Sequence, residues 1–137
     1  MEKKFKRDVN SLQEVFTFIE SFIEAIKLDK SFTFSLNLVA EELFINMVKY
    51  NSENPNNISI SLKKANNDLI LKFMDYDVEP FDITQTEDYD PKKPLQERQI
   101  GGLGIPFIKK MVDKILYEYE NRCSTITLIK HLRKANV

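Results

Sequence analysis

The spacing of the apolar residues changes between Tyr50 and Ile58, and this change restricts the fold more than any other feature of the sequence. From Leu12 to Tyr50 the apolar residues recur at helical intervals, whereas from Ile58 to Leu62 they alternate with polar residues, as in a strand with one buried face. Helices and strands that are segregated along a chain favour a mostly antiparallel sheet with the helices on one face. The sequence therefore predicts an α+β fold, a two-layer sandwich.

The expected elements follow the same spacing. In chain order they are a strand at 3–9, helices at about 12–26 and 31–50, a hairpin of strands at 58–62 and 69–74, a helix near 105–112, and strands near 115–120 and 125–132. The first helix has Asn10 or Ser11 as its expected N-cap, and the second has Ser31 or Thr33. Residues 76–100 fit no period and are interpreted as a lid loop.

Composition limits the classes of protein that this chain can be. Its 137 residues suit one domain, and 20 basic against 21 acidic side chains give no general attraction to nucleic acid or to an anionic membrane. No apolar run reaches the roughly 20 residues of a membrane span, and a single cysteine excludes an internal disulfide. We expect a cytoplasmic protein. The basic residues of segment 3–7 are interpreted as a solvated terminus.

One helix carries an unusual polar pair. Glu42 and Asn46 lie four positions apart, so that a carboxylate and a carboxamide share one face beside an apolar stripe, with Lys49 one turn further on. Such a pair can form the wall of a pocket, or it can belong to an ordinary solvated face. The second reading is favoured unless partners for the pair occur elsewhere in the chain.

All three glycines of the chain, Gly101, Gly102 and Gly104, fall within four positions, directly before the third expected helix. A glycine turn at a helix N-terminus favours phosphate binding, because unpaired N–H groups and the positive end of the helix dipole meet there. A simple tight turn explains the glycines equally well. The segment has neither the Lys-Ser/Thr ending of a P-loop nor a strand-linked Gly-x-Gly-x-x-Gly.

Taken in order, these motifs resemble the Bergerat-type ATP-binding fold, the fold of histidine kinase-like ATPases, and in particular its branch of anti-sigma factors that are serine protein kinases. Glu42 and Asn46 match the family motif Glu-x-x-x-Asn. Residues 75–82, Asp-Tyr-Asp-Val-Glu-Pro-Phe-Asp, are similar to Asp-x-Gly followed by Pro-Phe-Asp, with Asp77 in place of the glycine. Residues 95–105 are similar to the Gly-x-Gly motif and the Leu-Glu-Arg segment before it. The resemblance extends over residues 1–137 as one domain.

The resemblance implies a role for each matching residue. Asn46 would hold Mg²⁺ through its carboxamide oxygen while the ion bridges the ATP phosphates. Glu42 would be the general base that activates a serine or threonine hydroxyl. Asp75 would accept a hydrogen bond from the adenine amino group. The further implied site residues are Lys49 at a phosphate, Arg98 at the γ-phosphate, Gly102, Leu103, Gly104 and Ile105 in the nucleotide-binding turn, and Thr125, which would support adenine through water.

The implied function is that of an anti-sigma factor acting by partner switching. Such a protein binds a sigma factor, exchanges it for an anti-anti-sigma protein of the STAS type, and phosphorylates the latter on serine or threonine. A homodimer is expected by resemblance only. Because Asp77 replaces the motif glycine, the alternative is a binding module with the same fold and impaired nucleotide chemistry. A third reading, the catalytic part of a sensor histidine kinase, has no phosphoacceptor helical hairpin in this sequence.

Overall fold

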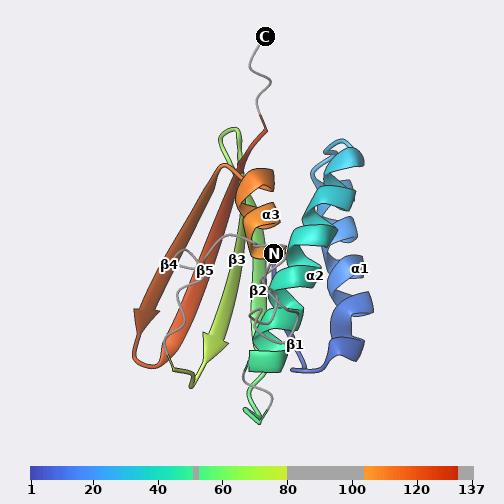
Figure 1. The fold of residues 1–137 in the computed structure, drawn as a ribbon. Helices are drawn as coiled ribbons and strands as arrows, with labels where there is room; N and C mark the ends of the chain where they lie inside the picture. Colours follow the sequence, from blue (N-terminus) through green and yellow to red (C-terminus); the bar gives the residue numbers. More distant parts are fainter. Residues whose placement is uncertain (51–52, 80–103, 133–137) are drawn as a thin grey trace, which may run out of the picture.

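The computed structural model describes residues 1–50, 53–79 and 104–132, which form one sheet covered on one face by helices (Figure 1). The sheet has the order β1-β2-β3-β5-β4, and every neighbouring pair is antiparallel. The predicted α+β sandwich with helices on one face is therefore confirmed. The elements are β1 (Glu2–Phe5), η1 (Val9–Ser11), α1 (Leu12–Ala25), α2 (Ser31–Tyr50), β2 (Ile58–Ala65), β3 (Asp68–Tyr76), α3 (Gly104–Met111), β4 (Lys114–Glu120) and β5 (Cys123–His131).

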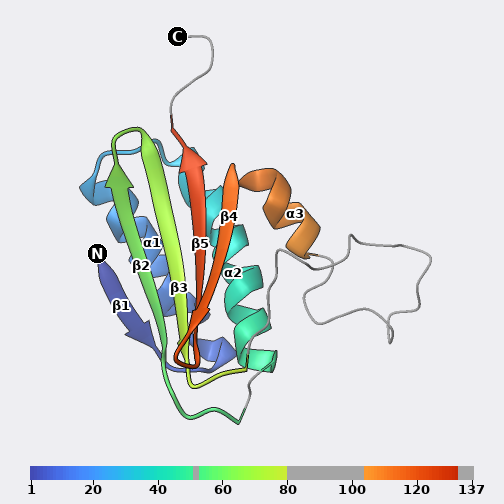
Figure 2. The same cartoon turned by 90° about the vertical axis from the view of Figure 1, so that its left-hand side faces the viewer.

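The sheet packs against the helix layer through alternate residues of its strands. In β2 and β3 the residues on the helix side are fully buried; they are Ile58, Ile60 and Leu62, and Leu69, Leu71 and Phe73. Figure 2 shows the sheet from the opposite side, with the helices behind it. Because side chains alternate between the two faces, the register of each strand pair decides which polar residues meet beneath the helices.

Helix α2 is the central element of the helix layer, with α1 and α3 as its neighbours (Figure 1). Aromatic side chains fasten the N-terminal strand beneath α1 and α2. The ring of Phe5 meets Phe18 and Phe44 edge to face, with ring centroids 5.7 and 6.5 Å apart. All three rings are buried, so they hold the segment that follows β1 close to the helices.

The beginning of the chain differs in detail from the expectation. Strand β1 ends at Phe5 rather than near residue 9, because the Asp8 side chain accepts a hydrogen bond from the Asn10 N–H (2.8 Å) and starts the 3-10 turn η1. Ser11 occupies the N-cap position of α1 but makes no side-chain capping bond. At the start of α2 the Asp29 carboxylate accepts a hydrogen bond from the Ser31 N–H (2.8 Å). Asp8 and Asp29 thus form the side-chain capping bonds that were expected of serine or threonine.

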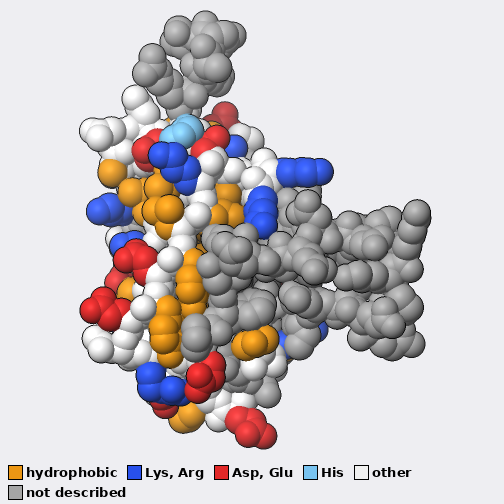
Figure 3. Space-filling view, turned by 60° about the vertical axis from the view of Figure 1, so that its left-hand side comes forward, with side chains coloured by type: hydrophobic (Ala, Val, Ile, Leu, Met, Phe, Trp, Pro, Cys, Tyr) orange, Lys and Arg blue, Asp and Glu red, His pale blue; other side chains and the backbone are white. Residues whose placement is uncertain are grey.

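The face of the sheet away from the helices carries exposed apolar side chains. Its exposed apolar side chains include Leu116 on β4, which is 48% exposed, and Tyr76 at the end of β3, which is 39% exposed. Figure 3 shows hydrophobic side chains on this side of the molecule interspersed with charged ones. None of the helices in the described part of the chain is long and apolar enough to cross a membrane.

Candidate functional site

The polar pair of α2 lies at the boundary between the core and the solvent. Glu42 is half-buried, Asn46 is buried with 4% of its surface exposed, and Lys49 is exposed. The three residues follow one another at positions i, i+4 and i+7 on one face of the helix. The predicted juxtaposition of the carboxylate and the carboxamide on α2 is therefore present.

The carboxamide oxygen of Asn46 has no hydrogen-bond partner in the described part of the chain. Its Oδ1 atom is buried and accepts no hydrogen bond from any residue that the structure describes. A buried polar atom that is left unpaired costs about 1–3 kcal/mol, and such an atom calls for an explanation, for example a ligand. A hard cation is a suitable partner, because it binds to oxygen.

Asp75 reaches the helix side of the sheet at the end of β3, next to a hydroxyl-bearing residue of β5. Asp75 pairs with Ser124 of β5, and both side chains are buried. Thr125 pairs with Met74, on the face away from the helices. The structure thus brings Ser124, and not Thr125, next to Asp75.

Arg7 forms a buried ion pair with Asp75. Its Nη2 donates to Oδ1 of Asp75 and its Nη1 donates to Oδ2 at 3.4 Å, and the two side chains are only 3% and 4% exposed. The interpretation of the basic N-terminal segment as solvated is therefore wrong for Arg7. Burial raises the pKa of the Asp75 carboxyl, and the hydrogen bond and charge of Arg7 lower it in part.

Asp77, which replaces the motif glycine, adopts the backbone conformation that favours glycine, with a φ of 59°. Its carboxylate accepts a hydrogen bond from Nε of Arg122 (2.9 Å) in the turn between β4 and β5, and the side chain is 64% exposed. The negative charge is therefore paired with a cation at the surface.

The segment after β3 is fixed from both sides. The Asn54 Nδ2 donates to the carbonyl oxygens of Tyr76 (2.8 Å) and Asp77 (3.1 Å). The Tyr119 hydroxyl donates to the Val78 carbonyl (2.7 Å), and Val78 is buried. These bonds hold residues 76–78, in the first part of the second motif, in place.

Replacing Asp77 with glycine is expected to change the free energy of unfolding by no more than about 1 kcal/mol. Glycine removes the cost of a positive φ, which stabilises the folded state, but it also has more entropy in the unfolded chain, which destabilises it. Loss of the exposed ion pair with Arg122 costs about 0.2–1 kcal/mol. Urea unfolding measures the change, with Asp77→Asn as the control that removes only the charge. A loss above about 2 kcal/mol would show that the bond to Arg122 holds this segment in place.

The glycine motif lies mostly beyond the described residues. Gly104 is the first residue of α3 and Ile105 follows it, as expected for a glycine segment at a helix N-terminus. Arg98, Gly102 and Leu103, like the lid loop from residue 80 onward, lie outside the described residues.

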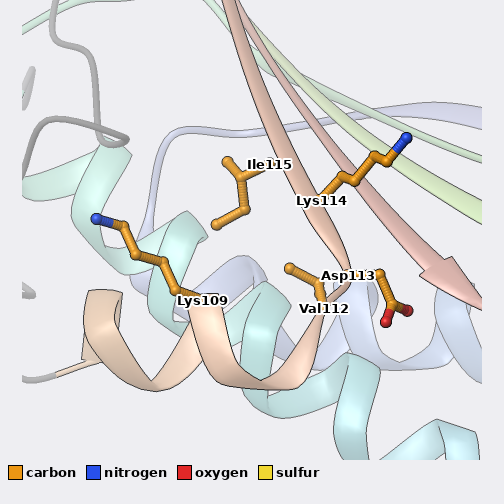
Figure 4. A pocket seen from close by; sticks show the side chains of 5 residues that line it. All are labelled: Lys109, Val112, Asp113, Lys114 and Ile115. Atoms are coloured by element: carbon orange, nitrogen blue, oxygen red, sulfur yellow. The ribbon is translucent and has the colours of Figure 1, made fainter.

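Two hollows in the described surface are lined by residues other than those predicted for the nucleotide site. One, of about 230 Å³, is at the end of α3; Figure 4 shows the side chains that line it, which are Lys109, Val112, Asp113, Lys114 and Ile115. The other, of about 530 Å³, lies beside β1 and is lined by Lys4, Pro55, Asn56, Asn57 and Tyr76. Neither hollow is lined by a residue that the sequence placed in the nucleotide site.

The fold and the order of the motifs define a histidine kinase-like ATP-binding domain, and comparison with known proteins agrees. Residues 5–130 match the histidine kinase-like ATPase domain family, and the chain belongs to that family. A chain in the crystal structure of the SiaB-SiaC complex from Pseudomonas aeruginosa has a similar fold, with a TM-score of 0.67 and 14% identity over 94% of this chain and 88% of that one. A comparison with curated proteins gave no match.

Proposed function

We propose that the chain is an ATP-binding anti-sigma factor that phosphorylates an anti-anti-sigma protein on serine or threonine. The observation that carries this proposal is the buried Oδ1 of Asn46, which has no hydrogen-bond partner among the described residues and lies one helical turn from Glu42. An oxygen that can bind a metal ion and a carboxylate that can act as a base are groups that phosphoryl-transfer enzymes use. The family match to an ATPase domain supports the nucleotide.

Asn46 suits Mg²⁺ because a carboxamide oxygen is a hard ligand. Among residues 1–50, 53–79 and 104–132, no three His, Cys, Asp or Glu side chains gather into a metal site. The ion would therefore be bound by Asn46 together with the phosphates and water, as Mg²⁺ usually is in nucleotide sites. Mg²⁺ would neutralise phosphate charge during transfer.

Glu42 is proposed as the general base. Its carboxylate is half-buried and would accept the proton of the attacking hydroxyl while Mg²⁺ holds the phosphates. Lys49 at the exposed end of the same face would bind a phosphate. For the nucleotide-binding turn we retain Gly102, Leu103, Gly104 and Ile105, with Arg98 at the γ-phosphate.

Asp75 is proposed to bind the adenine amino group. Because Ser124 faces Asp75 across β3 and β5, we assign to Ser124 the supporting role that the family resemblance implies for Thr125. A hydroxyl at this position can hold a water molecule against the base.

The proposed partners are a sigma factor and an anti-anti-sigma protein of the STAS type. The likeness to a chain of the SiaB-SiaC complex supports a protein that works by binding another protein. A homodimer in the cytoplasm completes the proposal.

Replacing Glu42 with glutamine is expected to lower the rate of phosphotransfer about 10²–10⁴-fold, because glutamine has the same shape but cannot accept the proton. The assay follows transfer of ³²P from labelled ATP to a STAS-type protein from the same organism. The neighbouring Glu41→Gln is the matched control. Unchanged labelling by the Glu42 variant would exclude Glu42 as the base.

The second candidate is a binding module without phosphotransfer, and the residue that favours it is Asp77, which stands in place of the motif glycine. Calorimetric titration with ATP, with and without Mg²⁺, separates the two candidates. Magnesium-dependent binding supports the kinase. Absence of binding, restored by Asp77→Gly, would support the binding module instead.

A further inference from the structure

Arg7 connects three parts of the fold at the carboxylate of Asp75. Besides its two bonds to Asp75, its Nη1 donates to the Met47 carbonyl in the last turns of α2 (3.1 Å), and its Nε donates to the Asn56 carbonyl before β2 (3.3 Å). The guanidinium thus ties the end of β3 to α2 and to the connection between α2 and β2. With both side chains almost fully buried, the carboxylate has a fixed position.

The bonds to Arg7 leave Asp75 with acceptor capacity. A carboxylate has about four lone-pair sites, and Arg7 bonds each oxygen once. The residue opposite on β5 is Ser124, which carries no charge. Asp75 can therefore accept a further hydrogen bond while it remains paired with Arg7.

The charge state of Asp75 depends on Arg7. Burial favours the protonated carboxyl, and Arg7 opposes this effect through a hydrogen bond and its charge. An ionised carboxylate only accepts hydrogen bonds, whereas a protonated carboxyl also donates one. Without Arg7, Asp75 would thus be protonated more easily, and its carboxyl could then hydrogen-bond to an acceptor as well as to a donor.

We propose that Arg7 is a positioning residue for base recognition: it holds Asp75 as a fixed carboxylate, so that the site selects a purine with a 6-amino group over one with a 6-carbonyl oxygen. This inference rests on the proposed ATP site. The 6-amino group can donate a hydrogen bond to the Asp75 carboxylate. A 6-carbonyl oxygen is itself an acceptor, so it cannot form a hydrogen bond with the carboxylate. The expected preference for ATP over ITP is about 10–100-fold.

The test compares dissociation constants of Mg-ATP and Mg-ITP by calorimetry for the full chain and two variants. Arg7→Gln keeps a hydrogen-bond donor without the charge, and the ATP preference should fall to within about threefold of equality. Arg7→Lys is the matched control, because it keeps the charge and should keep an ATP preference of at least about fivefold. Circular dichroism shows whether each variant is folded.

The ratio of the two affinities separates positioning from general support of the fold. A loosened site weakens the binding of ATP and ITP alike. An Arg7→Gln variant with the same ATP-to-ITP affinity ratio as the native chain would therefore overturn the role of Arg7. Equal binding of ATP and ITP by the native chain would also overturn it and leave the kinase proposal intact. Absence of binding by either nucleotide would overturn the proposed function itself, and the role of Arg7 with it.

Discussion

Replacing Arg7 with methionine is expected to lower the free energy of unfolding by about 3 kcal/mol at pH 7. Removal of one member of a buried ion pair leaves the other charge without a partner, which costs about 3–5 kcal/mol. The Met47 and Asn56 carbonyls also lose a donor. Urea unfolding measures the loss. The double variant Arg7→Met with Asp75→Asn removes both charges of the pair and should recover most of the lost stability. A double variant as unstable as the single one would contradict the ion-pair explanation.

The loss caused by Arg7→Met should shrink as the pH falls. Arg7 lowers the pKa of Asp75 against the larger raising effect of burial, so its removal raises the pKa in the folded variant further. When the pKa of a carboxyl is higher in the folded than in the unfolded protein, the group stabilises the fold fully at a pH below its pKa in the unfolded protein. This stabilisation is lost as the pH rises through its pKa in the folded protein. The deficit should be small near pH 4 and grow toward neutrality, to about 3 kcal/mol at pH 7. A deficit that does not change with pH would contradict a role for the Asp75 charge.

Replacing Asn46 with alanine is expected to weaken magnesium-dependent ATP binding about 10–100-fold, because the ion loses its one protein ligand of the proposed site. This factor corresponds to a charge-assisted contact of about 1.5–3 kcal/mol. Titration with ATP in the presence of Mg²⁺ and in the presence of EDTA separates the magnesium-dependent part. In EDTA the variant and the native chain should bind ATP alike.

Asn37→Ala is the matched control for Asn46→Ala. Asn37 lies on the same helix, and its Oδ1 is likewise buried without a partner among the described residues. The two asparagines are nine positions apart, which places them on opposite faces of α2. Asn37→Ala should therefore leave ATP binding unchanged. Equal losses in both variants would indicate a disturbed helix and exclude Asn46 as the ligand.

The sequence was sufficient where local spacing decides the outcome. An interval of four places Glu42 above Asn46 on any regular helix, and alternation gives each strand its buried face. These intervals do not depend on the rest of the chain. For this reason the helices, the hairpin, the α+β class and the polar pair of α2 could all be predicted before the structure was known.

The sequence was insufficient where residues far apart in the chain meet. Nothing in the basic segment 3–7 singles out Arg7, because its partner Asp75 is 68 positions away. The choice between Ser124 and Thr125 depends on the register of β3 with β5, and a change of one residue exchanges the two faces.

Asp77 shows how the two levels combine. The sequence identified it as the departure from the glycine motif, and the structure shows the same positive φ that glycine would adopt. Only the tertiary structure places Arg122 beside it and turns the charge outward. Periodic patterns along the chain thus determined which elements form, whereas the packing and the strand register of those elements decided which side chains meet and which charges are paired.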